Sequence, residues 1–263
     1  MSQTVNYQLD DKGVATVTLS RPEVQNAFDD LMIERLIQIF DEVNNEPRAR
    51  VMLLKSNAKS FSAGADLAWM ERMAGYDFDT NVSDAERMAD MFNTLYHMRI
   101  PTVAVVNGAA FGGGVGLVAA CDFAVGQPSA LFCLSEVGLG LAPSVISPFV
   151  IECIGVKAFK RAAISGMRIS AEQALHWGLL SHLAEEDTLN QLTEKLTQQL
   201  LQNGPEAMAA TKQLANDVAY REIGPQTKQH TSHLIASMRG SIEGREGISA
   251  FLGKRSAAWN VSL

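Results

Sequence analysis

FGGGVG, residues 111–116, is the most informative stretch of this sequence. It follows the apolar run 102–106, which is typical of a buried strand, and it precedes the apolar run 117–121, which is typical of a helix. A glycine turn in this position leaves backbone N–H groups at the start of a helix without intrahelical acceptors. The turn is therefore predicted to bind a negatively charged group.

One interpretation of this turn is a dinucleotide-binding loop. Glu136 lies about 20 residues beyond it, at the distance expected for a ribose-binding carboxylate. However, the pattern G-x-G-x-x-G fails when counted from Gly112, because Leu117 holds the place of the third glycine. The turn also lies in the middle of the chain and does not open a first βαβ unit. The sequence therefore disfavours a dinucleotide fold.

The second interpretation is an anion hole for a thioester enolate. An enolate carries its charge on the former carbonyl oxygen, so two converging N–H donors are needed. Another turn of small residues that enters a helix, SAGAD at 62–66, is the candidate for the second donor. The structural alternative, in which both turns are only tight connections between a strand and a helix, stays open at this point.

The rest of the chain predicts an α/β core followed by helices alone. A loop is expected after Arg21-Pro22, and a break over 75–82. The predicted strands are 14–19, 51–55, 102–106, 123–125 and 131–134. The predicted helices are 28–43, a stretch after Leu67, 83–98, 117–121, 145–154, 156–164, 171–177, 187–202, 205–219 and roughly 223–253.

Composition restricts the class of protein and of partner. Of 263 residues, 47% are hydrophobic and 19% are charged, which is ordinary for a globular chain with a sizeable core. With 22 Lys and Arg against 29 Asp and Glu, the net charge is −7, so no nucleic-acid partner is expected. Cys121, Cys133 and Cys153 have no metal-ligand spacing and are expected to be reduced core residues. Because no export signal or membrane span is present, we expect a cytoplasmic protein.

Several motifs occur in a fixed order along the chain. They are RPEVQNA (21–27), FSAGADL (61–67), NG followed by GGG (107–114), CD (121–122), SEVGLG (135–140), Gly155 and EGREGISAFLGKR (243–255). This ordered set resembles the crotonase superfamily, that of enoyl-CoA hydratases and isomerases, over nearly the whole chain. The segments ADLAWM (65–70) and LAPSVISPF (141–149) are similar to those of bacterial 3-methylglutaconyl-CoA hydratases.

The resemblance implies an α/β fold, with a spiral of repeated ββα units over residues 1–200 and a helical trimerisation region over 201–263. It implies a homotrimer or a dimer of trimers that binds an acyl-CoA thioester as substrate and needs no metal or other cofactor. The backbone N–H groups of Ala65 and Gly113 would be the oxyanion donors. The positions that it assigns to substrate or CoA binding are Ala63, Asp66, Leu67, Gly116, Phe251 and Lys254, the last two usually in the neighbouring subunit.

Typical hydratases of this superfamily carry two catalytic glutamates, and this chain keeps one of them. The position of the missing glutamate is Gly116, and the other matches Glu136. Glu136 follows the apolar run 131–134, so desolvation is expected to favour the neutral acid that donates a proton. A helix-start carboxylate that only interacts with N–H groups is the structural alternative. If hydration is the reaction, we expect Gly116→Glu to help an unsubstituted enoyl-CoA more than a glutaconyl-type ester.

Three functions stay open from the sequence. The first is hydration of an enoyl-CoA thioester, with 3-methylglutaconyl-CoA of leucine or isoprenoid-type degradation as the expected substrate, and with Ser144 or the substrate's own carboxylate positioning the water. The second is Δ3,Δ2-enoyl-CoA isomerisation, which needs one base. The third is a CoA-ester-binding homologue without turnover. The acyl pocket is expected to involve residues 141–149 and five methionines that core packing explains equally well: Met70, Met73, Met88, Met91 and Met98.

Overall fold

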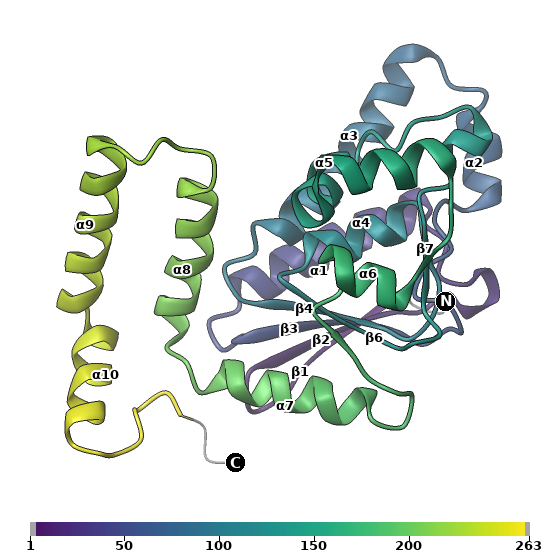
Figure 1. Ribbon diagram of the computed structural model, residues 1–263. Helices are drawn as coiled ribbons and strands as arrows, with labels where there is room; N and C mark the ends of the chain where they lie inside the picture. Colours follow the sequence, from purple (N-terminus) through teal and green to yellow (C-terminus); the bar gives the residue numbers. More distant parts are fainter. Residues whose placement is uncertain (1–3, 261–263) are drawn as a thin grey trace.

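The central sheet contains four of the predicted strands and gains one further strand at each edge. In the computed structural model, which describes residues 4–260, its order is β1-β2-β3-β4-β6-β9 (Figure 1). β1 runs antiparallel to β2, and every other neighbouring pair is parallel. Parallel strands are buried on both faces, which explains why β4 is apolar at nearly every position. The strands are β1 (Val5–Leu9), β2 (Val14–Leu19), β3 (Val51–Ser56), β4 (Thr102–Val106), β6 (Phe123–Gly126) and β9 (His182–Leu183).

A second, three-stranded sheet joins the segments on which the candidate site depends. β5 (Ala110–Phe111) pairs in parallel with β7 (Leu131–Cys133), and β7 pairs antiparallel with β8 (Ile169–Ser170). β5 leads directly into the glycine turn, and β7 leads toward Glu136. Because the ends of two parallel strands meet at the same edge of a sheet, the turn and the glutamate come to one place.

Helices pack on both faces of the central sheet. α1, α3, α4 and α5 bury apolar side chains against one face, and α7 covers the other (Figure 1). α4 is apolar on all sides and almost wholly buried, as expected for a helix inside a core. The helices are α1 (Asp30–Asn45), α2 (Leu67–Met73), α3 (Phe78–Tyr96), α4 (Gly113–Ala120), α5 (Ser147–Ser165), α6 (Ala171–Trp177) and α7 (Leu189–Leu201).

Three C-terminal helices stand beside this core and do not lie on the sheet (Figure 1). Arg50 Nη2 holds the start of this region by donating to the carbonyls of Leu201 and Asn203, at 3.0 and 2.9 Å. The carboxylate of Glu243 caps the first turn of α8, because it accepts from the backbone N–H groups of Glu206 and Ala207. The three helices are α8 (Pro205–Val218), α9 (Pro225–Gly240) and α10 (Ile242–Leu252).

The predicted α/β class with a helical C-terminal part is confirmed, and the differences are local. The sequence does not predict β1, β5, β8 or β9, of which the last three have only two residues each. The break predicted over 75–82 is wrong from Phe78 onward, since Asp77 starts α3 by accepting from the Thr80 N–H at 2.8 Å. The single helix predicted over 223–253 is wrong because Ser241 has extended dihedrals and caps α10. No helix within residues 4–260 has the length and apolarity that crossing a bilayer requires.

Candidate active site

The two turns of small residues lie in direct contact. Ser62 forms a bridge with Ala110, and the Phe111 N–H donates to the Ser62 carbonyl at 2.9 Å. A Cβ added to Gly114 would lie 2.9 Å from the same carbonyl oxygen, and one added to Gly64 would lie 3.0 Å from the Phe111 oxygen. Only glycine allows backbones to approach so closely. The contact favours the anion-hole interpretation, which requires the turns to converge.

The backbone N–H of Ala65 points away from Phe28, the residue with which Ala65 is paired. Ala65 forms a parallel bridge with Phe28, in which the Phe28 N–H donates to the Gly64 carbonyl and the Asp66 N–H donates to the Phe28 carbonyl, both at 2.7 Å. In this pattern the residue between the two bonds points its own N–H to the opposite side. The Ala65 N–H meets no acceptor within residues 4–260. It is a free donor on an exposed residue.

The N–H of Gly113 is the second free donor, at the first position of α4. Gly112, which precedes it, has φ 49° and ψ −118°, a conformation that glycine readily adopts and other residues avoid. The Gly112 N–H is used in a bond to the Cys133 carbonyl at 2.9 Å, whereas the Gly113 N–H meets no acceptor in the described part of the chain. The start of a helix also carries a partial positive charge. An oxyanion at this point would therefore be stabilised by both the donor and the helix.

Glu136 stands beside the second donor. It begins a short 3₁₀ helix, η2 (Glu136–Leu139), and a Cβ added to Gly112 would lie 3.2 Å from its Oε1. Its Oε2 is buried and meets no hydrogen-bond partner among residues 4–260. Burial raises the pKa of Glu136, against a smaller opposing effect of its own backbone N–H. Burial thus shifts the carboxyl group toward its neutral form, which is the form that can give a proton to a carbon atom next to the anion hole.

The raised pKa of Glu136 predicts a pH-dependent difference in thermal stability. The folded protein holds this proton to a higher pH than the unfolded chain, so burial costs no stability below about pH 4 and costs stability as pH rises through the raised pKa. Glu136→Gln should therefore raise Tm at pH 8 and leave it unchanged at about pH 4. Calorimetry at both values measures this. Glu172→Gln is the control, because the pKa of exposed Glu172 is lowered by the Ser170 side chain and its loss should not raise Tm.

The position of the missing family glutamate is closed by packing. Gly116 lies inside the core on α4, and a Cβ there would be 2.4 Å from Ile146 Cγ2 and 2.8 Å from Phe92 Cε1. No side chain larger than hydrogen fits without moving these two residues. The expectation that Gly116→Glu would help hydration is therefore wrong, because the carboxylate has no room.

We expect Gly116→Glu to destabilise the protein instead. Overpacking a core costs typically ~1–3 kcal/mol, and a buried unpaired carboxylate adds to this. Tm should fall, with no gain in turnover of any enoyl-CoA ester. Gly138→Glu is the matched control for Tm, since a Cβ at Gly138 meets no atom within 4 Å. An unchanged Tm in the Gly116 variant would contradict the packing that we describe.

The other predicted binding positions fall into three groups. Ala63 and Leu67 are exposed on either side of the Ala65 donor, where a ligand can reach them. Asp66 is buried, and its carboxylate caps α2 and contacts Arg21 at 2.9 Å. Burial opposes the ionisation of Asp66, but the N–H groups of Trp69 and Ala68 and the charge of Arg21 together lower its pKa. The Asp66 side chain therefore has a structural role in this chain.

Phe251 and Lys254 are exposed, at the end of α10 and just beyond it. Figure 1 places α10 on the opposite side of the molecule from α2. One chain therefore does not bring these two residues to the anion hole.

Four of the five methionines belong to the core or pack against it. Met91 and Met98 are buried in the core, and Met73 and Met88 pack against it. For these four, core packing is the correct interpretation.

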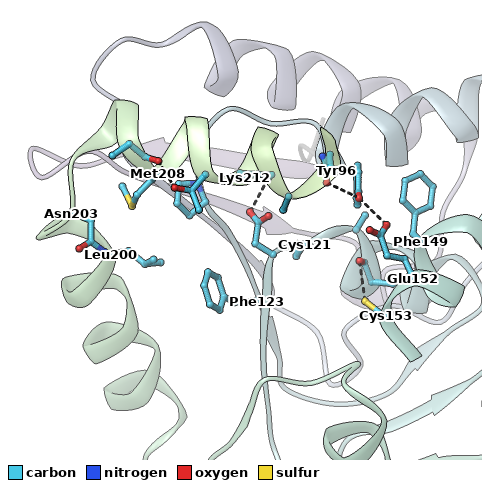
Figure 2. A pocket seen from close by; sticks show the side chains of 18 of the residues that line it. Tyr96, Cys121, Phe123, Phe149, Glu152, Cys153, Leu200, Asn203, Met208 and Lys212 are labelled. Atoms are coloured by element: carbon cyan, nitrogen blue, oxygen red, sulfur yellow. Dashed lines mark hydrogen bonds and ion pairs between the residues drawn. The ribbon is translucent and has the colours of Figure 1, made fainter. Parts of the chain in front are cut away.

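A separate groove lies away from the anion hole. It has a volume of about 680 Å³ and lies at the C-terminal end of α4, between the core and α8, whereas the anion hole is at the N-terminal end of that helix. Figure 2 shows Met208 and Lys212 of α8 on one side of the groove and Phe123 of the core on the other. The Asp122 carboxylate pairs with the Lys212 ammonium at 2.8 Å and accepts hydrogen bonds from the N–H and the hydroxyl of Thr102. Its role is therefore structural.

Sequence reasoning missed the residues that hold the two donors in place. Arg21 and Asn26 both belong to a quoted motif, yet no contact was predicted for either. The Asn26 side chain donates to Ser56 Oγ at 2.7 Å and to the Phe61 carbonyl at 3.2 Å, which fixes the chain just before the 62–66 turn. A buried Asn with φ 54° in a polar loop is the kind of residue that such a role requires.

Comparisons with known proteins show the fold and the family of this chain. The sequence model of the enoyl-CoA hydratase/isomerase family matches residues 10–262. The chain is 30% identical to the 2,3-dehydroadipyl-CoA hydratase of Escherichia coli, covering 92% of this chain and 93% of that protein. It is 29% identical to the 1,2-epoxyphenylacetyl-CoA isomerase of the same organism, covering 94% of each. A solved enoyl-CoA hydratase structure from Shewanella pealeana superimposes with a TM-score of 0.95 at 39% identity, covering 98% of this chain and 96% of that one. The fold is thus the crotonase fold, and the chain belongs to the enoyl-CoA hydratase/isomerase family.

Proposed function

We propose that this protein hydrates an α,β-unsaturated acyl-CoA thioester, with Glu136 as the one side-chain acid and base. The observation that carries the proposal is the position of the Glu136 carboxyl beside Gly112 and near the free N–H groups of Gly113 and Ala65, with its Oε2 buried and without a hydrogen-bond partner among residues 4–260. These groups supply the two requirements of an enolate reaction, which are stabilisation of an oxyanion and transfer of a proton.

The reaction balances with a single carboxyl group. Water adds to Cβ, and the electron pair of the double bond moves into the thioester, whose oxygen accepts from the Ala65 and Gly113 N–H groups. Glu136 gives its proton to Cα as the enolate collapses. The added water then loses a proton to the Glu136 carboxylate, which returns to its neutral form. A further group is required only to position the water, since Gly116 has no side chain that could do so.

The proposed substrate class is a branched, dicarboxylic thioester of the 3-methylglutaconyl type, as in leucine or isoprenoid-type degradation. The resemblance of residues 65–70 and 141–149 supports it. The missing carboxylate at Gly116 supports it as well, because the terminal carboxylate of such a substrate can hold the water. The exposed Ser144, in the loop between η2 and α5, is the protein group that can share this task.

Δ3,Δ2-enoyl-CoA isomerisation is the second candidate function. It is favoured by the closed space at Gly116, which Ile146 and Phe92 leave without room for a second carboxylate. Moving a proton between Cα and Cγ needs one base and no bound water. The same anion hole and the same glutamate serve this reaction.

Labelled water distinguishes the two reactions. The protein is incubated in heavy-oxygen water with methylglutaconyl-, crotonyl- and 3-enoyl-CoA esters, and the products are analysed by mass spectrometry. Hydration places the heavy oxygen at Cβ, whereas isomerisation introduces only solvent hydrogen. Heavy oxygen in none of the products would exclude the hydratase proposal, and an absence of any turnover would favour a CoA-ester-binding homologue.

The proposed assembly is a trimer or a dimer of trimers held by the C-terminal helices. α8 and α9 contain no buried residue, and Phe251, Leu252 and Ile242 are exposed by 82%, 74% and 91%. Apolar surface of this extent is typical of subunit contacts. Light scattering at micromolar concentration should give the mass of three or six chains, and Phe251→Glu should lower it. Leu31→Glu, at an exposed leucine of α1, is the control. A monomeric wild-type protein would exclude this assembly.

A further inference from the structure

Arg21 joins the starts of α1 and α2, whose caps directly follow the two residues of the Phe28–Ala65 bridge. Its Nη2 contacts Asp66 Oδ2 at 2.9 Å, and its Nη1 contacts Asp29 Oδ2 at 3.0 Å. The same Nη1 donates to the Ala27 carbonyl at 2.7 Å. The guanidinium is nearly buried, with 14% of its side chain exposed. One planar group therefore binds three acceptors from two segments that are almost 40 residues apart.

Both carboxylates are helix caps. The other oxygen of Asp29 accepts from the Met32 N–H at 2.8 Å and starts α1. The other oxygen of Asp66 accepts from the Ala68 N–H at 2.9 Å and starts α2. Each carboxylate thus uses one oxygen for its own helix and one for Arg21. The guanidinium fixes the two helix starts relative to each other.

The donor Ala65 lies between these two caps. It directly precedes Asp66, and its bridge partner Phe28 directly precedes Asp29. A shift of either cap moves one side of this bridge, and the direction of the Ala65 N–H depends on the bridge. The chain of contacts therefore leads from Arg21 through the two carboxylates to the oxyanion donor.

We infer that Arg21 is a positioning residue for catalysis, which aims the Ala65 N–H at the thioester oxygen by holding the Asp29 and Asp66 caps together. This inference rests on the proposed function, because it concerns the donor that the reaction uses. Arg21 itself touches no reacting atom. A fork-shaped guanidinium is needed, since the single ammonium of lysine cannot meet both carboxylates and a carbonyl in the same geometry.

The test measures how strongly the bound thioester is polarised. Butyryl-CoA with a ¹³C-labelled carbonyl is saturated and cannot be hydrated or isomerised, so its carbonyl stretching frequency reports the anion hole alone. In the wild-type protein this frequency should fall on binding. In Arg21→Gln the fall should be smaller, and kcat for the best enoyl-CoA substrate should decrease by on the order of 10²-fold with KM much less affected.

Two further variants make the result decisive. Arg72→Gln is the matched control, because Arg72 pairs with Asp30 at 2.6 Å between the same two helices but is exposed and contacts neither cap. It should keep the wild-type frequency and kcat. Arg21→Lys keeps the charge and loses the fork, and it carries the test if the glutamine variant does not fold. It should show the smaller frequency shift of the glutamine variant.

The outcomes separate this inference from the proposed function. A wild-type frequency that does not change on binding would refute the anion hole itself, and with it both ideas. A wild-type shift that persists in folded Arg21→Gln would refute only the positioning role. A wild-type frequency shift and kcat in Arg21→Lys would show that a positive charge is sufficient. This would contradict the inference that the guanidinium must contact both carboxylates.

Discussion

Glu136→Gln is expected to reduce turnover by ~10²–10⁴-fold, the usual contribution of general acid and base catalysis. The amide keeps the shape of the carboxyl group beside Gly112 but cannot give a proton to Cα. Binding of a CoA ester should change little, because the two donors of the anion hole are backbone N–H groups that the substitution leaves unaltered. Steady-state kinetics on the enoyl-CoA panel and calorimetric titration with butyryl-CoA measure the two effects separately.

The matched control for this prediction is Glu172→Gln. Glu172 also lies in the first turn of a helix, but it is exposed at the start of α6 and has no place in the site. Its turnover should equal that of the wild type. Full activity of Glu136→Gln on every acyl-CoA tested would show that the proposed mechanism is wrong, whatever the family.

Ala65→Pro is expected to reduce kcat by ~10²–10³-fold, the usual effect of removing one oxyanion donor. Proline has no N–H, and the N–H of Ala65 takes part in no other contact within residues 4–260. Ala65 is exposed, and the two bonds of its bridge belong to Gly64 and Asp66, so they stay available. The loss should appear mainly in kcat, because the enolate uses the donor more strongly than the ground state does.

Ala65 is a better position for this test than Gly113. A Cβ at Gly113 would lie 2.7 Å from Phe28 Cε2, so Gly113→Pro changes packing as well as hydrogen bonding. Ala65→Ser is the control, since it keeps the N–H and should retain most of the activity. A folded Ala65→Pro protein with wild-type kcat would remove Ala65 from the anion hole.

Much of the fold and the central part of the site follow from local sequence signals. The apolar runs of β2 and β4 predict buried strands, and the helix predicted over 171–177 agrees with α6 at both ends. The glycine turn and the small-residue turn predict the two donors, because close backbone approach and free N–H groups depend on a few neighbouring residues. Glu136 is assigned as catalytic through the resemblance to the crotonase superfamily, because its position after an apolar run alone is equally compatible with a helix-start carboxylate.

The features that were not predicted depend on contacts between distant residues. The strands β8 and β9 are too short to show a period, and they form only because neighbouring strands bind them. The partners of Arg21 lie 8 and 45 residues away, and no local pattern marks the more distant one. The space for a Cβ at Gly116 depends on where Phe92 of α3 and Ile146, just before α5, pack against α4, and the sequence around the glycine does not state this.

The packing around Gly116 also restricts how this enzyme can evolve. A chain that acquires a carboxylate at residue 116 first meets Ile146 and Phe92, and selection would remove it as a poorly folded protein before any gain in chemistry appeared. A smaller residue at 146 or 92 has to arise earlier, when it is of no catalytic use. The order of substitutions is therefore constrained, and the effect of a glutamate at 116 depends on the residues already present at two other positions. In this lineage, a second catalytic carboxylate is separated from the present sequence by a valley of low fitness.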